Sequence, residues 1–229
     1  MNAGRTHLLL TLVTLVAVGM PVAIWTRTAA GRLAENQGKA PEVATAAASD
    51  VGYCTGNLKQ ILRRVLTSCG LIQGGGSRGC QPLQARQVAA MSGGDFNALF
   101  APLSGRAAIL QFDKDSAELD PSAIQLLEKT FSDRRGASYF FVVSRASPEG
   151  SVEHNRDLSH RRGNAVMTAI KAVFQDPDID QEVGLLWLGE EFAQLDQQFC
   201  QWQRSRATEP CTTADLNRSA FIAWIDCRL

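Results

Sequence analysis

The sequence predicts an α/β protein in which one face of a β-sheet is covered by helices. From residue 106 onward, short apolar runs typical of strands alternate with longer amphipathic runs typical of helices. Turn-forming and helix-capping residues separate the runs, as at Asp120-Pro121, where Asp is a good N-cap and Pro suits the first helical position. This alternation is typical of a sheet with helices packed against it.

The chain begins with an almost unbroken apolar run at residues 8–25, which contains no Asp, Glu, Lys or Arg. A run of about 18 residues is at the lower limit for a membrane-spanning helix. We therefore expect residues 1–25 to be an N-terminal membrane anchor. The alternative is a cleaved signal peptide, with Ala17 and Gly19 as small residues before the cut. The lack of a carboxylate in the run argues against an intramembrane ion or proton relay.

Residues 26–51 are rich in Ala, Gly, Glu, Asn and Pro without apolar periodicity, which predicts a flexible linker. Residues 52–104 are predicted to be a small helical, Cys-containing segment. Its first helix lies between Cys54 and Cys69, a second covers residues 83–91, and a turn follows at 95–100. The first helix has an apolar stripe formed by Leu58, Ile61, Leu62, Val65 and Leu66.

The predicted elements of the last part, residues 105–229, come in a regular order. We expect strands at residues 107–112, 138–144, 183–188 and 220–227, and helices from Pro121, at 155–175 and at 191–204. The first of these helices would bury Ile124, Leu127 and Phe131.

The helix at 155–175 has one residue that does not match its buried face. Leu158, Val166, Ile170 and Val173 recur at spacings of three or four, and Arg162 lies on the same stripe. A buried guanidinium is costly unless an anion meets it. That anion is either an internal carboxylate or the carboxylate of a ligand.

Charge and cysteine content restrict the class of protein further. The 23 Lys and Arg balance the 23 Asp and Glu, and no long basic run occurs, so nucleic acid is not an expected partner. All 6 cysteines follow the apolar run, and an even number favours disulfides and an oxidising compartment. Cys54 and Cys69 flank a predicted helix of more than about 20 Å, too long for one disulfide. No His accompanies the cysteines at a metal-ligand spacing, so no zinc site or other cofactor is expected.

Four motifs of residues 105–229 resemble, in order and spacing, those of OmpA-like peptidoglycan-binding domains. The central one is Asn155-x-x-Leu158-Ser159-x-x-Arg162 followed by Val166. The others are residues 109–119 (a strand and an Asp-rich turn), Leu188-Gly189-Glu190, and Asn217-Arg218 before the last strand. The resemblance implies a two-layer sandwich with a mixed sheet and helices on one face.

The resemblance also implies a ligand, the diaminopimelate of the peptidoglycan stem peptide, which ends in a carboxylate and an ammonium on one carbon. Arg162 would clamp the carboxylate. Asn155 and Asp115 match ligand-contacting positions, and Leu158 belongs to the same signature. Ser147 stands where the family has the aspartate that binds the ammonium, and Glu149 or Asp115 are the neighbours that would supply the missing charge.

The resemblance further implies a short disulfide loop between Cys200 and Cys211. The remaining connectivities stay open. They are Cys69–Cys80 with Cys54–Cys227, or Cys80–Cys227.

No catalytic constellation stands out, so we expect a binding module and not an enzyme. The expected function is non-covalent attachment of a membrane protein or an envelope complex to peptidoglycan. The expected location is the bacterial inner membrane, single-pass, with residues 105–229 in the periplasm, or the periplasm itself if the apolar run is cleaved. The alternative function is an OmpA-like protein-interaction module of an envelope or secretion assembly that does not bind peptidoglycan.

Overall fold

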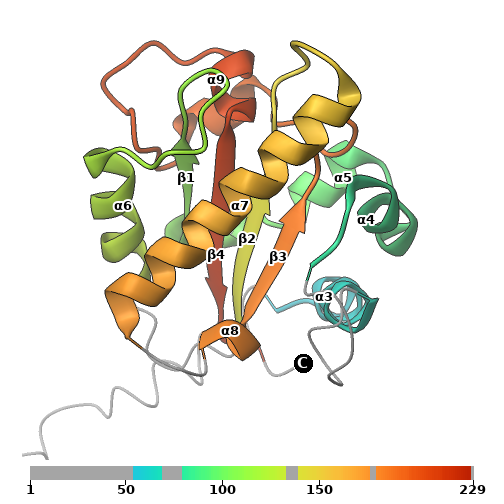
Figure 1. Ribbon diagram of the computed structural model, residues 1–229. Helices are drawn as coiled ribbons and strands as arrows, with labels where there is room; N and C mark the ends of the chain where they lie inside the picture. Colours follow the sequence, from blue (N-terminus) through green and yellow to red (C-terminus); the bar gives the residue numbers. More distant parts are fainter. Residues whose placement is uncertain (1–53, 69–78, 133–138, 176–178, 228–229) are drawn as a thin grey trace, which may run out of the picture. The chain divides into compact units, whose positions relative to one another are not determined.

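The computed structural model describes residues 54–68, 79–132, 139–175 and 179–227, all within a compact unit that spans residues 48–229 (Figure 1). The predicted anchor at 1–25 and linker at 26–51 lie outside the described residues. Among the helices of the described residues, none combines the length and the apolar character that crossing a membrane requires.

The centre of the unit is a four-stranded mixed sheet with the order β1-β4-β2-β3. Its strands are β1 (Ala107–Gln111), β2 (Tyr139–Ser144), β3 (Val183–Trp187) and β4 (Ser219–Ile225). β4 pairs antiparallel with both β1 and β2, whereas β2 and β3 are parallel. The predicted strands and the mixed sheet are therefore confirmed. β1, β2 and β3 run in one direction, so their carboxyl ends meet the start of β4 at the same end of the sheet.

The first face of the sheet is covered by α6 (Pro121–Ser132) and α7 (Val152–Phe174), which lie side by side in Figure 1. A short helix, α8 (Ile179–Glu182), leads into β3. Every second strand residue points to this face, since side chains alternate along a strand. The buried residues of this layer include Leu110, Val142, Leu127, Phe131, Val166 and Ile170. Ile124, expected in this core, is only half-buried, and Ala123 takes its place.

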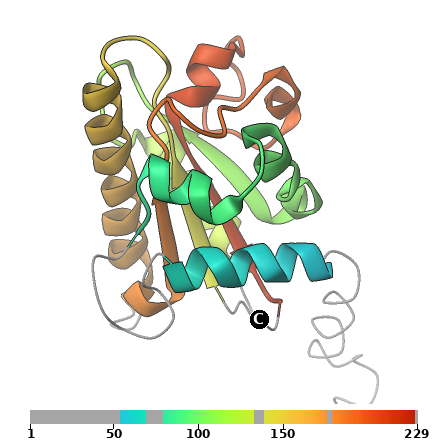
Figure 2. The same cartoon turned by 90° about the vertical axis from the view of Figure 1, so that its right-hand side faces the viewer.

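The second face is also covered, which corrects the prediction of helices on one face only. α3 (Gly56–Ser68), α4 (Pro82–Ala89), α5 (Gly93–Ala98) and the 3-10 helix η1 (Ala101–Arg106) belong to this layer, seen in front of the sheet in Figure 2. Their buried side chains form one cluster with the other set of strand residues, including Ile109, Phe141, Val143 and Phe221. The strands are buried on both faces, and a sheet with two apolar faces needs cover on both sides. The apolar stripe predicted for the first helix is confirmed, since all five of its residues are buried.

Capping residues define the start and end of α7. The Ser151 hydroxyl accepts a hydrogen bond from the His154 backbone N–H, and Gln175 ends the helix in the left-handed conformation with φ 48°. Between these ends α7 comes very close to the sheet at Gly163. A Cβ there would lie 2.6 Å from Leu185 Cδ1 and 2.9 Å from Ser144 Oγ. The glycine therefore permits a helix–sheet contact that any larger residue would push apart.

The prediction of a helix at residues 191–204 is wrong. The chain there forms turns and a short 3-10 helix, η2 (Gln197–Gln201), and then pairs with β1 through an isolated bridge between Ile109 and Arg204. Side chains from elsewhere bind the backbone carbonyls of this segment. Asn217, in the short helix α9 (Thr213–Asn217), donates to the Leu195 carbonyl at 2.9 Å. These carbonyls have partners from outside the segment, so the backbone is satisfied without a helix.

Two disulfides join described residues. Cys200–Cys211 has a Cα–Cα distance of 5.9 Å, which confirms the pair implied by the resemblance. Cys54–Cys227 has a Cα–Cα distance of 5.8 Å and connects the start of the described chain to the end of β4. The alternative Cys80–Cys227 is therefore wrong. Cys80 is disulfide-bonded as well, and Cys69 lies outside the described residues.

Candidate functional site

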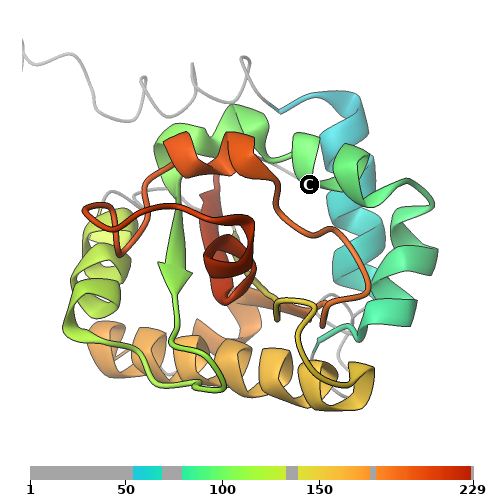
Figure 3. The ribbon, with the colours of Figure 1, turned by 90° about the horizontal axis from the view of Figure 1, so that it is seen from above.

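The candidate site lies at the end of the sheet where β1, β2 and β3 finish and β4 begins. Viewed from above in Figure 3, the first turns of α7 lie beside the connections that follow β1 and β2. We use the name loop cluster for residues 112–120, 145–151, 188–191, the first turns of α7 and Arg218. The topology thus brings together the predicted ligand-binding residues Asp115, Ser147, Asn155, Leu158 and Arg162.

The buried side chain of Arg162 joins the loops after β1 and β2 through hydrogen bonds. Its Nε donates to the Ser116 carbonyl at 2.9 Å, and Nη1 and Nη2 donate to the Arg145 and Asp113 carbonyls at 3.0 Å each. The side chain has 0% exposure, and its guanidinium lies 5.2 Å from the centre of the Phe112 ring. Burial, followed by the positive charge of Arg218, lowers the pKa of Arg162 to about 10.

The hydrogen bonds of Arg162 bear on one of the two anions expected for it, the internal carboxylate. Among the described residues its acceptors are three backbone carbonyls and no internal carboxylate. A ligand carboxylate stays a prediction. These bonds use one N–H of each nitrogen, and a guanidinium has five. Among the described residues, one N–H on each terminal nitrogen is therefore left for a further acceptor, the number that the two oxygens of a carboxylate require.

Asn155 is buried and joins two of the loops. Its Nδ2 donates to the Glu190 carboxylate at 2.5 Å and to the Glu149 carbonyl at 3.3 Å. Ser159, one turn later, accepts a hydrogen bond from the Gly189 backbone N–H at 3.0 Å. Leu158 is buried as well. These residues of the signature therefore hold the loop after β2 and the loop after β3 against α7.

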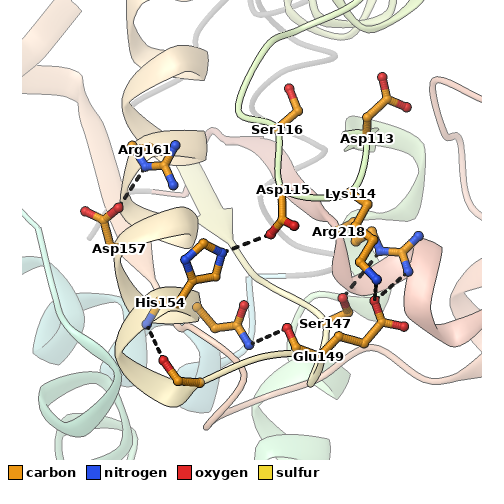
Figure 4. Close-up of polar contacts among 12 residues, drawn as sticks. Asp113, Lys114, Asp115, Ser116, Ser147, Glu149, His154, Asp157, Arg161 and Arg218 are labelled. Carbon is orange, nitrogen blue, oxygen red and sulfur yellow. Dashed lines mark hydrogen bonds and ion pairs between the residues drawn. The ribbon is translucent and has the colours of Figure 1, made fainter.

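Ser147 lies beside a cation. It is 5% exposed, and its hydroxyl accepts a long hydrogen bond from Arg218 Nε at 3.4 Å. Arg218 also donates to the Glu149 carboxylate at 2.9 Å, which lowers the pKa of Glu149. Lys114 Nζ lies 3.6 Å from the same carboxylate. Figure 4 shows these four residues gathered on one side of the loop cluster.

Asp115 is the exposed member of the predicted set. Its side chain is 64% exposed, and its Oδ1 lies 2.9 Å from His154 Nε2, toward which it points in Figure 4. This hydrogen bond lowers the pKa of Asp115 below its ordinary value. Asp115 has φ 57°, a left-handed conformation that Asp tolerates better than most residues.

Arg145 is a buried residue of the site region that the motifs did not indicate. Its guanidinium donates to the Ala193 carbonyl at 2.6 Å, the Val143 carbonyl at 3.2 Å and Asn97 Oδ1 at 2.9 Å. Burial lowers the pKa of Arg145 to about 9. The sequence did contain a signal that Arg145 would be buried, because the two-residue period of β2 puts residue 145 on the same sheet face as Val143.

A bidentate ion pair lies on the outer side of the loop cluster. Arg156 donates to both oxygens of Glu191, at 2.5 Å and 2.6 Å, which lowers the pKa of Glu191. The described residues contain no group of three or more His, Cys, Asp or Glu side chains placed to hold a metal ion. The chemistry that the site offers is thus the recognition of charged and hydrogen-bonding groups.

No protein-family model matches this chain, and no curated protein matches it. Solved structures with partial similarity include the OmpA-like domain of FopA1 from Francisella tularensis subsp. tularensis SCHU S4, with 16% identity over 51% of this chain and 69% of that one, and a TM-score of 0.34. A putative MotB-like protein from Desulfovibrio vulgaris has 17% identity, the same two coverages and a TM-score of 0.34. The first is described as a domain of the family that the sequence motifs resemble.

Proposed function

We propose that this chain is a non-catalytic envelope protein whose loop cluster binds the stem peptide of peptidoglycan through its diaminopimelate. In this proposal the protein attaches a membrane protein or an envelope complex to the cell wall, and its N-terminal run anchors it in the inner membrane. The compartment would be the periplasm, where disulfides persist.

The observation that carries the proposal is the hydrogen bonding of the Arg162 guanidinium. Its three carbonyl bonds orient the guanidinium rigidly, and the two remaining N–H groups suit a carboxylate. Asn155 in α7 and Asp115 after β1, two further predicted ligand-contacting residues, lie at the same end of the sheet. Because Arg162 has no exposed surface, a ligand carboxylate reaches it only when the residues that cover it move aside. Binding in this proposal therefore includes a loop rearrangement.

The test is retention of the full chain, with its disulfides intact, by purified peptidoglycan sacculi. Residues 54–104 must be kept, because they cover the second face of the sheet. The informative pair of variants is Asp115→Asn and Asp157→Asn. Both side chains are 64% exposed and each has one ion-pair partner. Asp115 pairs with His154 from the loop after β1, whereas Asp157 pairs with Arg161 along α7, on the side of the helix away from Asp115 in Figure 4.

We expect Asp115→Asn to lower retention and Asp157→Asn to leave it unchanged. If the folded wild-type chain is not retained, the proposal fails. Equal behaviour of the two variants would place the binding surface elsewhere.

A second candidate function, a protein-interaction module of an envelope or secretion assembly, is favoured by one specific observation. Arg162, Asn155 and Ser147 are all buried and all have partners within the protein. A chain that used these residues only to hold its loops together would give no retention by sacculi while remaining folded.

A further inference from the structure

The part of the chain that covers the second face of the sheet has an uneven charge balance. Residues 51–94 contain no Asp and no Glu, although the whole chain has 23 of these and 23 Lys and Arg. The basic residues of this segment are Lys59, Arg63, Arg64, Arg78 and Arg86. The opposite layer differs, since α6 and α7 contain both acidic and basic side chains. The charged side chains of α3 and α4 are therefore all positive, in a chain whose net charge is zero.

Three of these arginines are exposed and can bind an external anion. Arg63 and Arg64 lie on α3, and Arg86 lies on α4, which packs against α3. Within the described ranges of the chain, no hydrogen bond or ion pair joins these three side chains to another residue. In the opposite layer, by contrast, the exposed Arg156 and Arg161 pair with carboxylates at 2.5 Å and 2.8 Å. The described residues therefore leave the charge of the three arginines without a neutralising partner.

An exposed leucine accompanies these arginines. Among the large apolar side chains of the described residues, Leu83 is the exposed one, at 64%, and it lies on α4 three positions before Arg86. Residues three apart are neighbours on one side of a helix. We use the name basic face for the exposed side chains of Arg63, Arg64, Leu83 and Arg86 on α3 and α4, two helices in front of the sheet in Figure 2. Basic side chains beside an exposed large apolar one are typical of surfaces that bind the headgroup region of a bilayer.

The position of the basic face in the chain favours a lipid surface over another anionic partner. α3 begins at Gly56, shortly after the linker predicted at residues 26–51, which follows the expected membrane anchor. A flexible linker of about 26 residues keeps its two ends within roughly 25–30 Å of each other on average. At the effective concentration that such a tether provides, a weak attraction to the bilayer is sufficient. Each basic residue near an anionic bilayer increases binding about fivefold, so three arginines increase it about 100-fold.

We propose that the basic face binds the anionic phospholipid surface of the membrane in which the chain is anchored. The three arginines bind the lipid phosphates, and Leu83 enters the headgroup region. This inference goes beyond the proposed function, because it takes from it the membrane anchor but needs no peptidoglycan ligand. The basic face contains none of the predicted ligand-binding residues, so lipid binding and retention by sacculi can be measured separately.

The test uses the full chain, with its disulfides oxidised, reconstituted into vesicles so that the predicted anchor is inserted in every sample. The vesicles are phosphatidylcholine alone, or phosphatidylcholine mixed equally with phosphatidylglycerol, with bromine on the acyl chains to quench tryptophan fluorescence. Leu83→Trp places a reporter on the basic face, and Glu128→Trp places one on the exposed side of α6, in the opposite layer. The chain without either substitution gives the signal of the native tryptophans.

We expect quenching of the Leu83→Trp reporter in the anionic mixture but not in phosphatidylcholine alone, and no added quenching of the Glu128→Trp reporter in either. Two sets of substitutions are then compared in the Leu83→Trp chain. The first removes the arginines of the basic face by Arg63→Gln, Arg64→Gln and Arg86→Gln. The second removes the same charge from exposed positions of α6 and α7 by Lys129→Gln, Arg161→Gln and Lys171→Gln.

The first set should lower the ratio of bound to unbound basic face about 100-fold, and the second should leave it unchanged. Thermal unfolding verifies that both are folded. Absence of quenching in the anionic mixture, equal quenching in both kinds of vesicle, or equal loss with the two sets would each overturn the inference. None of these outcomes bears on retention by sacculi, so the peptidoglycan proposal would still stand or fall by its own test.

Discussion

Replacement of Arg162 by alanine tests whether this residue holds the fold together. The wild-type side chain donates to three carbonyls in two connections, those that follow β1 and β2. Hydrogen bonds from a charged group contribute about 1.5–3 kcal/mol each, so three amount to roughly 4.5–9 kcal/mol. Burial of a guanidinium without a carboxylate partner costs several kcal/mol and offsets part of this sum.

We therefore expect Arg162→Ala to lower the free energy of unfolding by about 3–5 kcal/mol. For a unit of this size, that corresponds to a fall in Tm of roughly 10 °C. The assay is urea and thermal unfolding followed by circular dichroism, with the disulfides kept oxidised.

The adjacent Arg161 provides the matched control. It lies on the same helix, is 48% exposed and makes one i,i+4 ion pair with Asp157. Such a pair contributes about 0.3–0.5 kcal/mol, so Arg161→Ala should be nearly neutral. If Arg162→Ala stays within about 1 kcal/mol of the wild type, the carbonyl bonds are not stabilising and the reasoning is refuted.

Three further predictions concern the fold around the site. Gly163→Ala should lower the free energy of unfolding by about 1–3 kcal/mol, because its Cβ would overlap side chains of the sheet. The control is Gly105→Ala, since a Cβ at Gly105 would have nothing within 4 Å. Equal thermal unfolding of the two variants would contradict the close approach at Gly163. Replacing Cys54 and Cys227 together by serine should lower the free energy of unfolding, measured in urea, by about 5 kcal/mol, because their disulfide closes a loop of 173 residues. An unchanged urea midpoint would count against this prediction. The hydrogen bonds from Arg156 lower the pKa of Glu191 in the folded state, so the stability from this pair is fully present above the ordinary value of 4.5 and is lost as the pH falls through the lowered pKa. Glu191→Gln should flatten this part of the pH dependence of Tm, which lies below pH 4.5. A profile identical to the wild type would exclude the pair as its source.

The amino-acid sequence by itself determined the local elements around the site. The apolar stripe of α3, the Asp120 cap with Pro121, and the four strands all follow from periodicity and capping, which act over a few residues. The position of Arg162 on a buried helical stripe was also visible in the sequence. It is confirmed by a side chain with no exposed surface.

The partners of the buried polar residues were decided only by the tertiary structure. Arg162 donates hydrogen bonds to the carbonyls of Ser116 and Asp113, which lie 46 and 49 positions earlier in the chain. Arg145 donates to the carbonyl of Ala193, 48 positions later. No local pattern encodes which carbonyl a guanidinium reaches, because that depends on where the strands place their loops. The same long-range contacts explain why residues 191–204 are not helical, since their carbonyls are bound from outside.

Which elements cover the second face of the sheet was likewise determined only by the tertiary structure. The strands are apolar on both faces in the sequence, yet nothing local says that α3, α4 and α5, rather than a partner, would bury the second face. The Cys54–Cys227 disulfide joins residues 173 positions apart, and spacing alone left its pairing open. Sequence periodicity determines which surface must be buried, and only the assembled chain decides what buries it.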